Sequence, residues 1–164
     1  MNANVQFITH DTPAVRPDRA QIAQVDLAPF GLPNLMEQVW LKSIGGEEYE
    51  MCCLPFRVYG LALGDVVRLD LTSRIVSRIK RRSGNRVFRL FFPVSIADRE
   101  FRSVKRTIVS RIENSGLLAE WSGPRHVAID VPVSGSIDSV WEVVRENEGV
   151  ILWEWADVEE FRAE

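Results

Sequence analysis

The chain has 164 residues, a length that one folded domain accommodates, because a single hydrophobic core commonly serves chains of up to about 250 residues. Hydrophobic residues make up 46% and charged residues 26% of the sequence, which is typical of a folded globular protein and excludes a wholly disordered or collagen-like chain. The net charge of -3, from 20 basic and 23 acidic residues, is too small to indicate a nucleic-acid partner by itself.

Signals for export or membrane insertion are missing from the sequence. The N-terminal residues contain no cationic stretch followed by an apolar core, and no apolar run approaches the roughly 18 residues of a membrane-spanning helix. Cys52 and Cys53 are adjacent, so a disulfide between them would close no long loop. We therefore expect a cytoplasmic protein with no membrane partner.

Residues 1–34 differ in character from the rest of the chain. They contain four prolines and show no sustained strand or helix periodicity. We expect an extended N-terminal arm here, which either lies loosely on the surface or grasps a partner, and a single α+β domain over residues 35–164.

The β-rich part of this domain covers residues 35–82. Two strand-like runs flank Gly45 and Gly46, which suit the positive φ angles of a tight hairpin turn. A run rich in β-branched residues follows the turn at Gly64, and two further strand-like runs lie on either side of residues 83–85. These signals predict an N-terminal antiparallel β segment.

Two amphipathic helices are predicted within residues 83–157. The first begins near Ser95, where Asp98 completes a sequence like a capping box, and ends before Gly116; its apolar stripe is Phe101, Val104, Ile108 and Ile112. The second begins at Ser136 and ends at Gly149; its stripe is Ile137, Val140, Trp141 and Val144.

The strands predicted around these helices complete a known order of elements. Strand-like runs at residues 86–92, 117–121, 125–133 and 150–158 give the order strand, helix, strand, strand, helix, strand. This is the order of a split βαββαβ, or ferredoxin-like, unit with two helices on one sheet face. Residues 158–164 are expected to form a polar tail.

No residue pattern indicates an active site, a metal site or a cofactor. His10 lies in the expected arm and His126 at the start of a strand, and neither has a nucleophile motif beside it. Metal-ligand spacings and glycine-rich phosphate loops are also missing. We expect no catalytic residue, metal or cofactor, although an enzyme of an unrecognised type stays open as a third reading.

Acidic residues dominate the last part of the chain. Residues 142–164 contain eight acidic residues against Arg145 and Arg162. Trp153 and Trp155 alternate with Glu154, so both indoles face one side of the final strand, either as core residues or as part of an interface. The interface reading predicts a surface for a basic protein, with candidate partner-binding residues Trp153, Glu154, Trp155, Asp157, Glu159 and Glu160.

Basic residues concentrate in a second segment, residues 72–89, which contains no acidic residue. A charged edge that resists aggregation explains this segment without a ligand. Binding of nucleic acid or of another phosphate ligand is the functional alternative, and its candidate residues are Arg74, Arg78, Lys80, Arg82 and Arg86.

A family resemblance rests on Trp40, Tyr49, Pro55-Phe56, Gly60 and Gly64-Asp65-Val66-Val67, followed by Ser83-Gly84 and the RVFRLFF strand. These marks resemble an uncharacterised bacterial family, domain of unknown function 4265, from about Glu37 to Asp157. The resemblance implies bacterial origin and a compact α+β domain, and it assigns no functional residue. Asp65 is interpreted as a turn residue.

Together these observations favour a small non-enzymatic module that binds a protein partner. We expect an immunity or antitoxin-like protein that neutralises a bacterial toxin, with nucleic-acid binding as the alternative. The sequence does not determine the oligomeric state.

Overall fold

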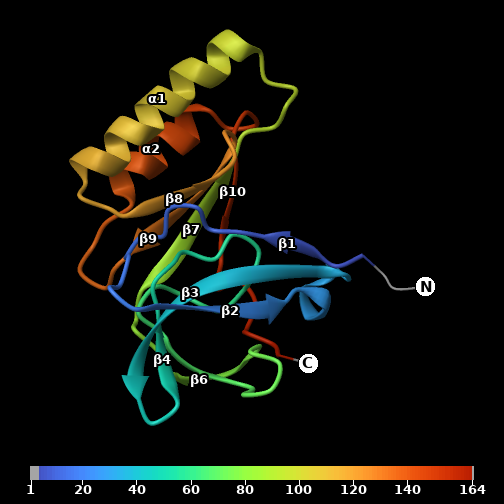
Figure 1. Ribbon diagram of the computed structural model, residues 1–164. Coiled ribbons are helices and arrows are strands. Elements are labelled where there is room, and N and C mark those ends of the chain that lie inside the picture. Colours follow the sequence, from blue (N-terminus) through green and yellow to red (C-terminus); the bar gives the residue numbers. More distant parts are fainter. Residues whose placement is uncertain (1–3, 164) are drawn as a thin grey trace.

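Two β-sheets and two helices make up the computed structural model, which describes residues 4–163 (Figure 1). The α+β class expected from the sequence is confirmed. Residues 1–3 of the expected arm and residue 164 of the expected tail lie outside the described residues.

The first sheet is six-stranded, with the order β1-β3-β4-β5-β6 and with β2 paired to β3. β1 is parallel to β3, and the other pairs are antiparallel. The backbone N–H of Gln24 donates to the carbonyl of Arg74 at 3.1 Å, so the sheet curls and β2 approaches the start of β6. Its strands are β1 (Gln6–Ile8), β2 (Ala20–Asp26), β3 (Leu35–Gly45), β4 (Glu48–Met51), β5 (Val66–Leu69) and β6 (Val76–Arg81).

The proline-bearing segment for which the sequence predicts an arm contributes β1, β2 and a short 3-10 helix (Ala28–Phe30) to this part of the fold. Ala23, Val25 and Leu27 are fully buried in the core of the first sheet. The alternation of Ala23, Val25 and Leu27, which begins in β2, is the strand signal, but it covers too few residues to stand out among the prolines and charges around it.

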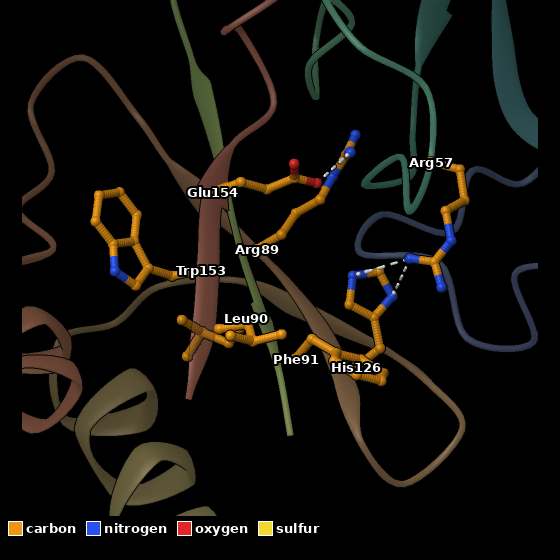
Figure 2. A pocket seen from close by; sticks show the side chains of 8 residues that line it. Arg57, Arg89, Leu90, Phe91, His126, Trp153 and Glu154 are labelled. Atoms are coloured by element: carbon orange, nitrogen blue, oxygen red, sulfur yellow. Dashed lines mark hydrogen bonds and ion pairs between the residues drawn. The ribbon is translucent and has the colours of Figure 1, made fainter. Parts of the chain in front are cut away.

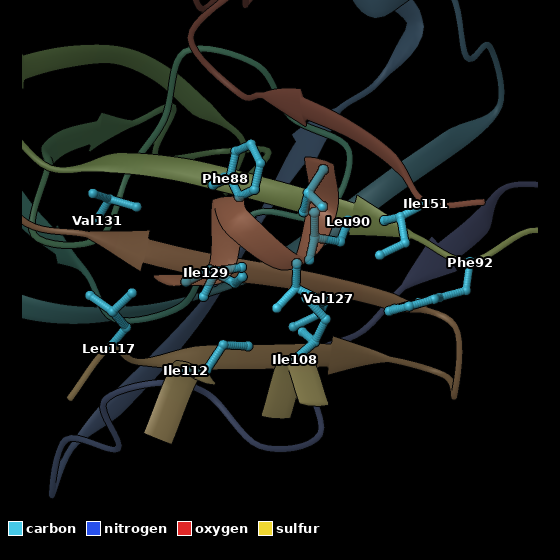
Figure 3. Packing of buried hydrophobic residues seen from close by; sticks show 13 residues of the cluster. Phe88, Leu90, Phe92, Ile108, Ile112, Leu117, Val127, Ile129, Val131 and Ile151 are labelled. Atoms are coloured by element: carbon cyan, nitrogen blue, oxygen red, sulfur yellow. The ribbon is translucent and has the colours of Figure 1, made fainter. Parts of the chain in front are cut away.

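The second sheet is four-stranded and antiparallel, with the order β10-β7-β9-β8. Its helices lie together on one face, where they bury the apolar residues of alternate strand positions (Figures 1 and 3). The elements are β7 (Arg86–Phe91), α1 (Asp98–Asn114), β8 (Ala119–Ser122), β9 (His126–Val131), α2 (Asp138–Glu146) and β10 (Leu152–Trp155).

Both helices begin later than the expected start signals. α1 begins at Asp98 after Ala97, which makes no side-chain cap, so Ser95 is too far from the first turn to cap it. The hydroxyl of Ser136 accepts a hydrogen bond from the Asp138 N–H at 3.1 Å, just before α2 begins. The predicted apolar stripes do face the core, with Ile108, Ile112 and Val140 buried among the rest of that cluster.

The other face of the second sheet carries buried polar side chains. Because side chains alternate along strands, Phe88 and Leu90 pack beneath the helices while Arg89 points to the opposite face. Glu120, His126 and Asp130 lie on that same face and are also buried. The chain between β4 and β5 packs over this face, with Leu54, Phe56, Ala62 and Leu63 forming a third apolar cluster with Val87 and Ala128.

Candidate functional site

The segment of residues 52–65, here called the central loop, connects β4 to β5 and lies between the two sheets. It carries the Pro55-Phe56 and Gly60 marks of the family resemblance. Gly60 has a positive φ of 72°, and the backbone of residues 160 and 161 passes so close to it that a side chain would not fit. Charged side chains from several other segments hold the rest of the loop in place.

Glu37 of β3 anchors the central loop through its backbone. Its carboxylate accepts hydrogen bonds from the N–H groups of Phe56 at 2.5 Å, Arg57 at 2.8 Å and Val58 at 3.1 Å. Burial acts to raise the pKa of Glu37, but hydrogen bonding and attraction to His10, with the loop N–H groups, hold the pKa below its usual value. A buried carboxylate satisfied in this way fixes the loop conformation.

His10 links Glu37 to a second buried carboxylate, Glu120 of β8. Its Nε2 lies 3.0 Å from Glu37 Oε1, and its Nδ1 lies 2.6 Å from Glu120 Oε2. Burial acts to lower the pKa of His10, but the two carboxylates raise it to about 9. The ring is therefore an imidazolium that donates from both nitrogens, and it has no lone pair to offer as a general base.

Glu120 ties the N-terminal segment to the central loop. Its Oε1 accepts from the N–H groups of Ala14 and Leu54, each at 2.7 Å. The His10 ring also stacks on Phe56, with ring centroids 4.3 Å apart. The His10, Glu37 and Glu120 cluster thus joins both sheets to the central loop and leaves no free catalytic group.

Arg89 of β7 holds the loop from the other side and is only 2% exposed. Its guanidinium donates to the carbonyls of Pro55 and Val58 and pairs with Glu154 of β10 at 3.1 Å. The Tyr59 hydroxyl donates to the same carboxylate at 2.7 Å. Burial, together with Glu154, raises the pKa of Tyr59 to about 12, so the phenol stays protonated and keeps this bond.

A hollow of about 160 Å³ opens beside these groups, between the central loop and β10 (Figure 2). Arg57 and Arg89 supply its positive charge, and Glu154 is the one acidic residue in its lining. The complete lining is Arg57, Arg89, Leu90, Phe91, His126, Leu152, Trp153 and Glu154.

His126 is neutral in this hollow. Burial, together with the nearby Arg57 and Arg89 charges, lowers its pKa to about 3. Arg57 Nη1 lies 3.0 Å from the Nδ1 and 3.3 Å from the Nε2 of the ring (Figure 2). An arginine only donates, so the histidine lone pair is occupied by Arg57 and cannot serve as a base.

The expected partner-binding residues lie in and after β10. Trp153 and Trp155 share the helix-covered face and contact Phe88, while Glu154 lies on the opposite face with Arg89. Trp153 is still 48% exposed. Asp157 pairs with Arg86 at 2.9 Å and Glu159 with Arg162 at 3.4 Å, whereas Glu160 is exposed. Several of the acidic side chains are thus already paired within the chain.

The expected phosphate-binding residues are dispersed. Arg86 stacks on Trp155 and pairs with Asp157, and Arg82 pairs with Asp65 at 3.4 Å. Register shifts in the pairing of β5 with β6 interrupt the strict alternation that would align the remaining cations. Arg74 contacts Gln21 and Ile22, while Arg78 and Lys80 are exposed on β6.

The residues that organise the central loop were not predicted as site residues. His10 and Glu120 are 110 positions apart in the sequence, so no spacing rule joins them. One sequence signal was present: Arg89 and Glu120 each stand between apolar residues of a strand, and a charge that is buried in this way requires a partner. Arg57 carries the same signal within the apolar residues of the central loop.

Residues 4–163 contain neither a metal-binding cluster nor a helix that could span a membrane. No group of three or more histidine, cysteine or acidic side chains is arranged to hold a metal ion within this range. No helix in the same part of the chain is long and apolar enough to cross a membrane.

Comparison with known proteins shows a family match that includes the central loop and β5, where several residues of the family resemblance lie. Residues 37–155 match the family described as domain of unknown function (DUF4265). The chain belongs to this family. The expected resemblance from about Glu37 to Asp157 is therefore confirmed, and it carries no established activity.

One solved structure is similar in fold, a hypothetical protein from Neisseria gonorrhoeae. The two share 12% sequence identity and a TM-score of 0.61, with 87% of this chain and 98% of that chain covered. At this identity the likeness concerns the fold alone. No curated protein matches the chain.

Proposed function

We propose that this chain is a non-enzymatic protein-binding module whose binding surface is the edge strand β10. The observation that carries the proposal is the exposure of apolar side chains on both faces of this sheet edge: Leu152 is 53% and Phe91 39% exposed on one face, and Trp153 is 48% exposed on the other. Leu152 and Phe91 are register partners on β10 and β7, and Trp153 follows Leu152. Exposed aromatic residues at a sheet edge promote aggregation unless a partner covers them, and tryptophan is the residue most enriched in binding hot spots.

The chemistry of the buried charged groups supports a non-enzymatic role. The His10 imidazolium has no lone pair, the His126 lone pair is engaged by Arg57, and the carboxylates of Glu37 and Glu120 each accept several hydrogen bonds. Each of these groups is used in positioning the central loop.

The specific form of this proposal is an immunity or antitoxin-like protein that neutralises a bacterial toxin in the cytoplasm. It is supported by the excess of acidic residues after position 142, eight against two basic residues, which would repel a nucleic acid and attract a basic toxin surface. Because Glu154 and Asp157 are paired within the chain, Trp153 and the exposed Glu160 are the side chains best able to meet such a partner.

For the architecture we infer a ferredoxin-like arrangement of residues 86–155. The order β7-α1-β8-β9-α2-β10 along the chain and β10-β7-β9-β8 across the sheet supports it. In this arrangement β10 is an edge strand whose one side is open, which suits the proposed binding surface.

Position-specific photo-crosslinking in the host cell tests the proposed function. Benzoylphenylalanine replaces Trp153 in one variant and Val133, which is 78% exposed after β9, in the control. We expect one discrete protein adduct from position 153, none from position 133, and no effect of nuclease treatment. Equal labelling at the two positions, no adduct at 153 or an adduct lost on nuclease treatment would contradict the proposal.

A further inference from the structure

The hollow beside β10 differs from an ordinary surface depression in its charge, and we infer that it binds a carboxylate from a partner. The ligand is the acidic side chain of an extended partner segment that adds to the open edge of β10. This inference rests on the proposed protein-binding function and concerns only the partner segment at β10, whereas the exposed acidic residues after β10 would meet a separate, basic part of the same partner.

Arg57 is the positively charged group of the hollow that lacks an acidic partner. Within residues 4–163 its guanidinium forms no ion pair with an acidic side chain, and its Nη1 contacts the Phe56 carbonyl and the neutral His126 ring. Its Nε and Nη2 make no hydrogen bond in this part of the chain, and the hollow that Arg57 lines gives a ligand access to them. A partly buried guanidinium with open donors is suited to a carboxylate, which it can bind through two parallel hydrogen bonds.

The other charges of the hollow leave it positive. Arg89 contributes a second guanidinium, and Glu154 offsets one of the two positive charges. His126 is neutral, and the side chains of Phe91 and Leu152 form an apolar rim on this face of the sheet. An incoming carboxylate would pair with the Arg57 guanidinium in a partly desolvated setting, where such a pair is stronger than at an open surface.

The size of the hollow favours a side chain over a free metabolite. Its volume is about 160 Å³. Pockets for drug-sized small molecules usually have volumes of at least about 300 Å³. A glutamate or aspartate side chain fits this smaller space while its backbone lies outside.

The open edge of β10 provides a place for that backbone. β10 is the last strand of its sheet, and the Ala156 N–H donates to the Val87 carbonyl just beyond it. In an antiparallel pair, the backbone N–H and C=O groups of every second residue point toward the neighbouring strand. Because Ala156 points these groups toward β7, Trp153, three positions earlier, points them away from β7 and toward the open edge. An added strand could form hydrogen bonds there.

A second hollow, of about 510 Å³, lies on the other face of β10 against α2. It is lined by Trp141, Val144 and Ile151 and shares Leu152 and Trp153 with the first. Side chains of an added strand alternate between the two faces, so an acidic residue entering the first hollow would place its neighbours at the second. The recognised segment therefore alternates acidic and apolar side chains.

Two matched peptides test this inference with the full-length protein. Acetyl-Val-Glu-Val-amide and acetyl-Val-Gln-Val-amide differ only in the charged group, and the Trp153 indole N–H signal in NMR reports binding. We expect the glutamate peptide to bind roughly tenfold more tightly. Arg57→Gln should abolish this preference, while Arg78→Gln, which removes the same charge on exposed β6, should keep it.

The outcomes separate this inference from the proposed function. Equal binding of the two peptides, no binding of either, or an unchanged preference in Arg57→Gln would overturn the carboxylate site, whatever crosslinking at position 153 shows. Conversely, an Arg57-dependent preference without any protein adduct would keep the carboxylate site and overturn the protein-binding function. A dimer in sedimentation that the glutamate peptide does not dissociate would assign the edge to a second copy and overturn the inference.

Discussion

Protonation of His10 should control how the stability of this protein depends on pH. The pKa of His10 is raised to about 9 in the folded protein, against 6.5 for an ordinary histidine, so folding favours the protonated ring. The stabilisation is complete below pH 6.5 and is lost as the pH rises through 9. The shift corresponds to about 3 kcal/mol in total, of which about 2 kcal/mol disappears between pH 7 and pH 9.

Urea denaturation followed by tryptophan fluorescence at pH 7 and pH 9 measures this effect. Wild type should lose about 2 kcal/mol more than His10→Gln over this interval, because the variant has no group at this position that titrates. His126→Gln is the matched control: the pKa of His126 is lowered to about 3, so this ring is neutral in both states above pH 7 and the variant should follow wild type. If His10→Gln instead showed the same loss as wild type, His10 would not be an imidazolium between Glu37 and Glu120.

Three further predictions concern Gly60, Asp65 and Asp130, and Gly31→Ala is the control for the first. In thermal denaturation, Gly60→Ala should lower the free energy of unfolding by at least about 3 kcal/mol and Gly31→Ala by about 1 kcal/mol. Both glycines have positive φ, but only Gly60 faces the backbone of residue 161. Equal losses in the two variants would refute this close approach. Asp65→Ala should lower the free energy of unfolding by about 2 to 3 kcal/mol, because the Ala62 and Ser83 N–H groups lose their acceptor. Crosslinking from position 153 in the folded variant should be unchanged. A loss of the adduct without a loss of stability would make Asp65 a binding residue. Burial raises the pKa of Asp130 to about 6, so the stabilisation from its protonated form is present below pH 3.8 and is lost as the pH rises through 6. The free energy of unfolding of Asp130→Asn should therefore exceed that of wild type by about 1 to 2 kcal/mol at pH 7.5 and by little at pH 4. The same increase at both pH values would argue against a charged Asp130.

Local signals in the sequence predicted the elements whose periodicity runs for several turns or strand positions. The apolar stripe of residues 101–112 is the buried face of α1, and the alternation of Trp153, Glu154 and Trp155 places the two indoles together on β10. The first strands were harder to predict, because the short alternation of Ala23 and Val25 lies among prolines and charges and gains its meaning from pairing with β3.

The candidate site depended on contacts between distant parts of the chain. Arg57, Arg89 and His126 are far apart in the sequence, and the hollow exists because the central loop packs on the polar face of the second sheet. A charged residue inside an apolar run indicates that a partner is needed, but the partner is chosen by the packing of separate strands. Arg57 therefore could have been noticed from the sequence, whereas its open donors and its place beside β10 could not.

The amino-acid sequence by itself determined the α+β class, the two amphipathic helices, the family and the alternation of β10, because each of these is encoded by neighbouring residues. The tertiary structure alone decided that His10 is held between Glu37 and Glu120, that several acidic residues near the C-terminus are neutralised within the chain, and that Trp153 remains partly exposed at an open sheet edge. The physical reason is range: periodicity and turn preferences act over a few residues, whereas burial and charge pairing are set by which distant strands the fold brings together.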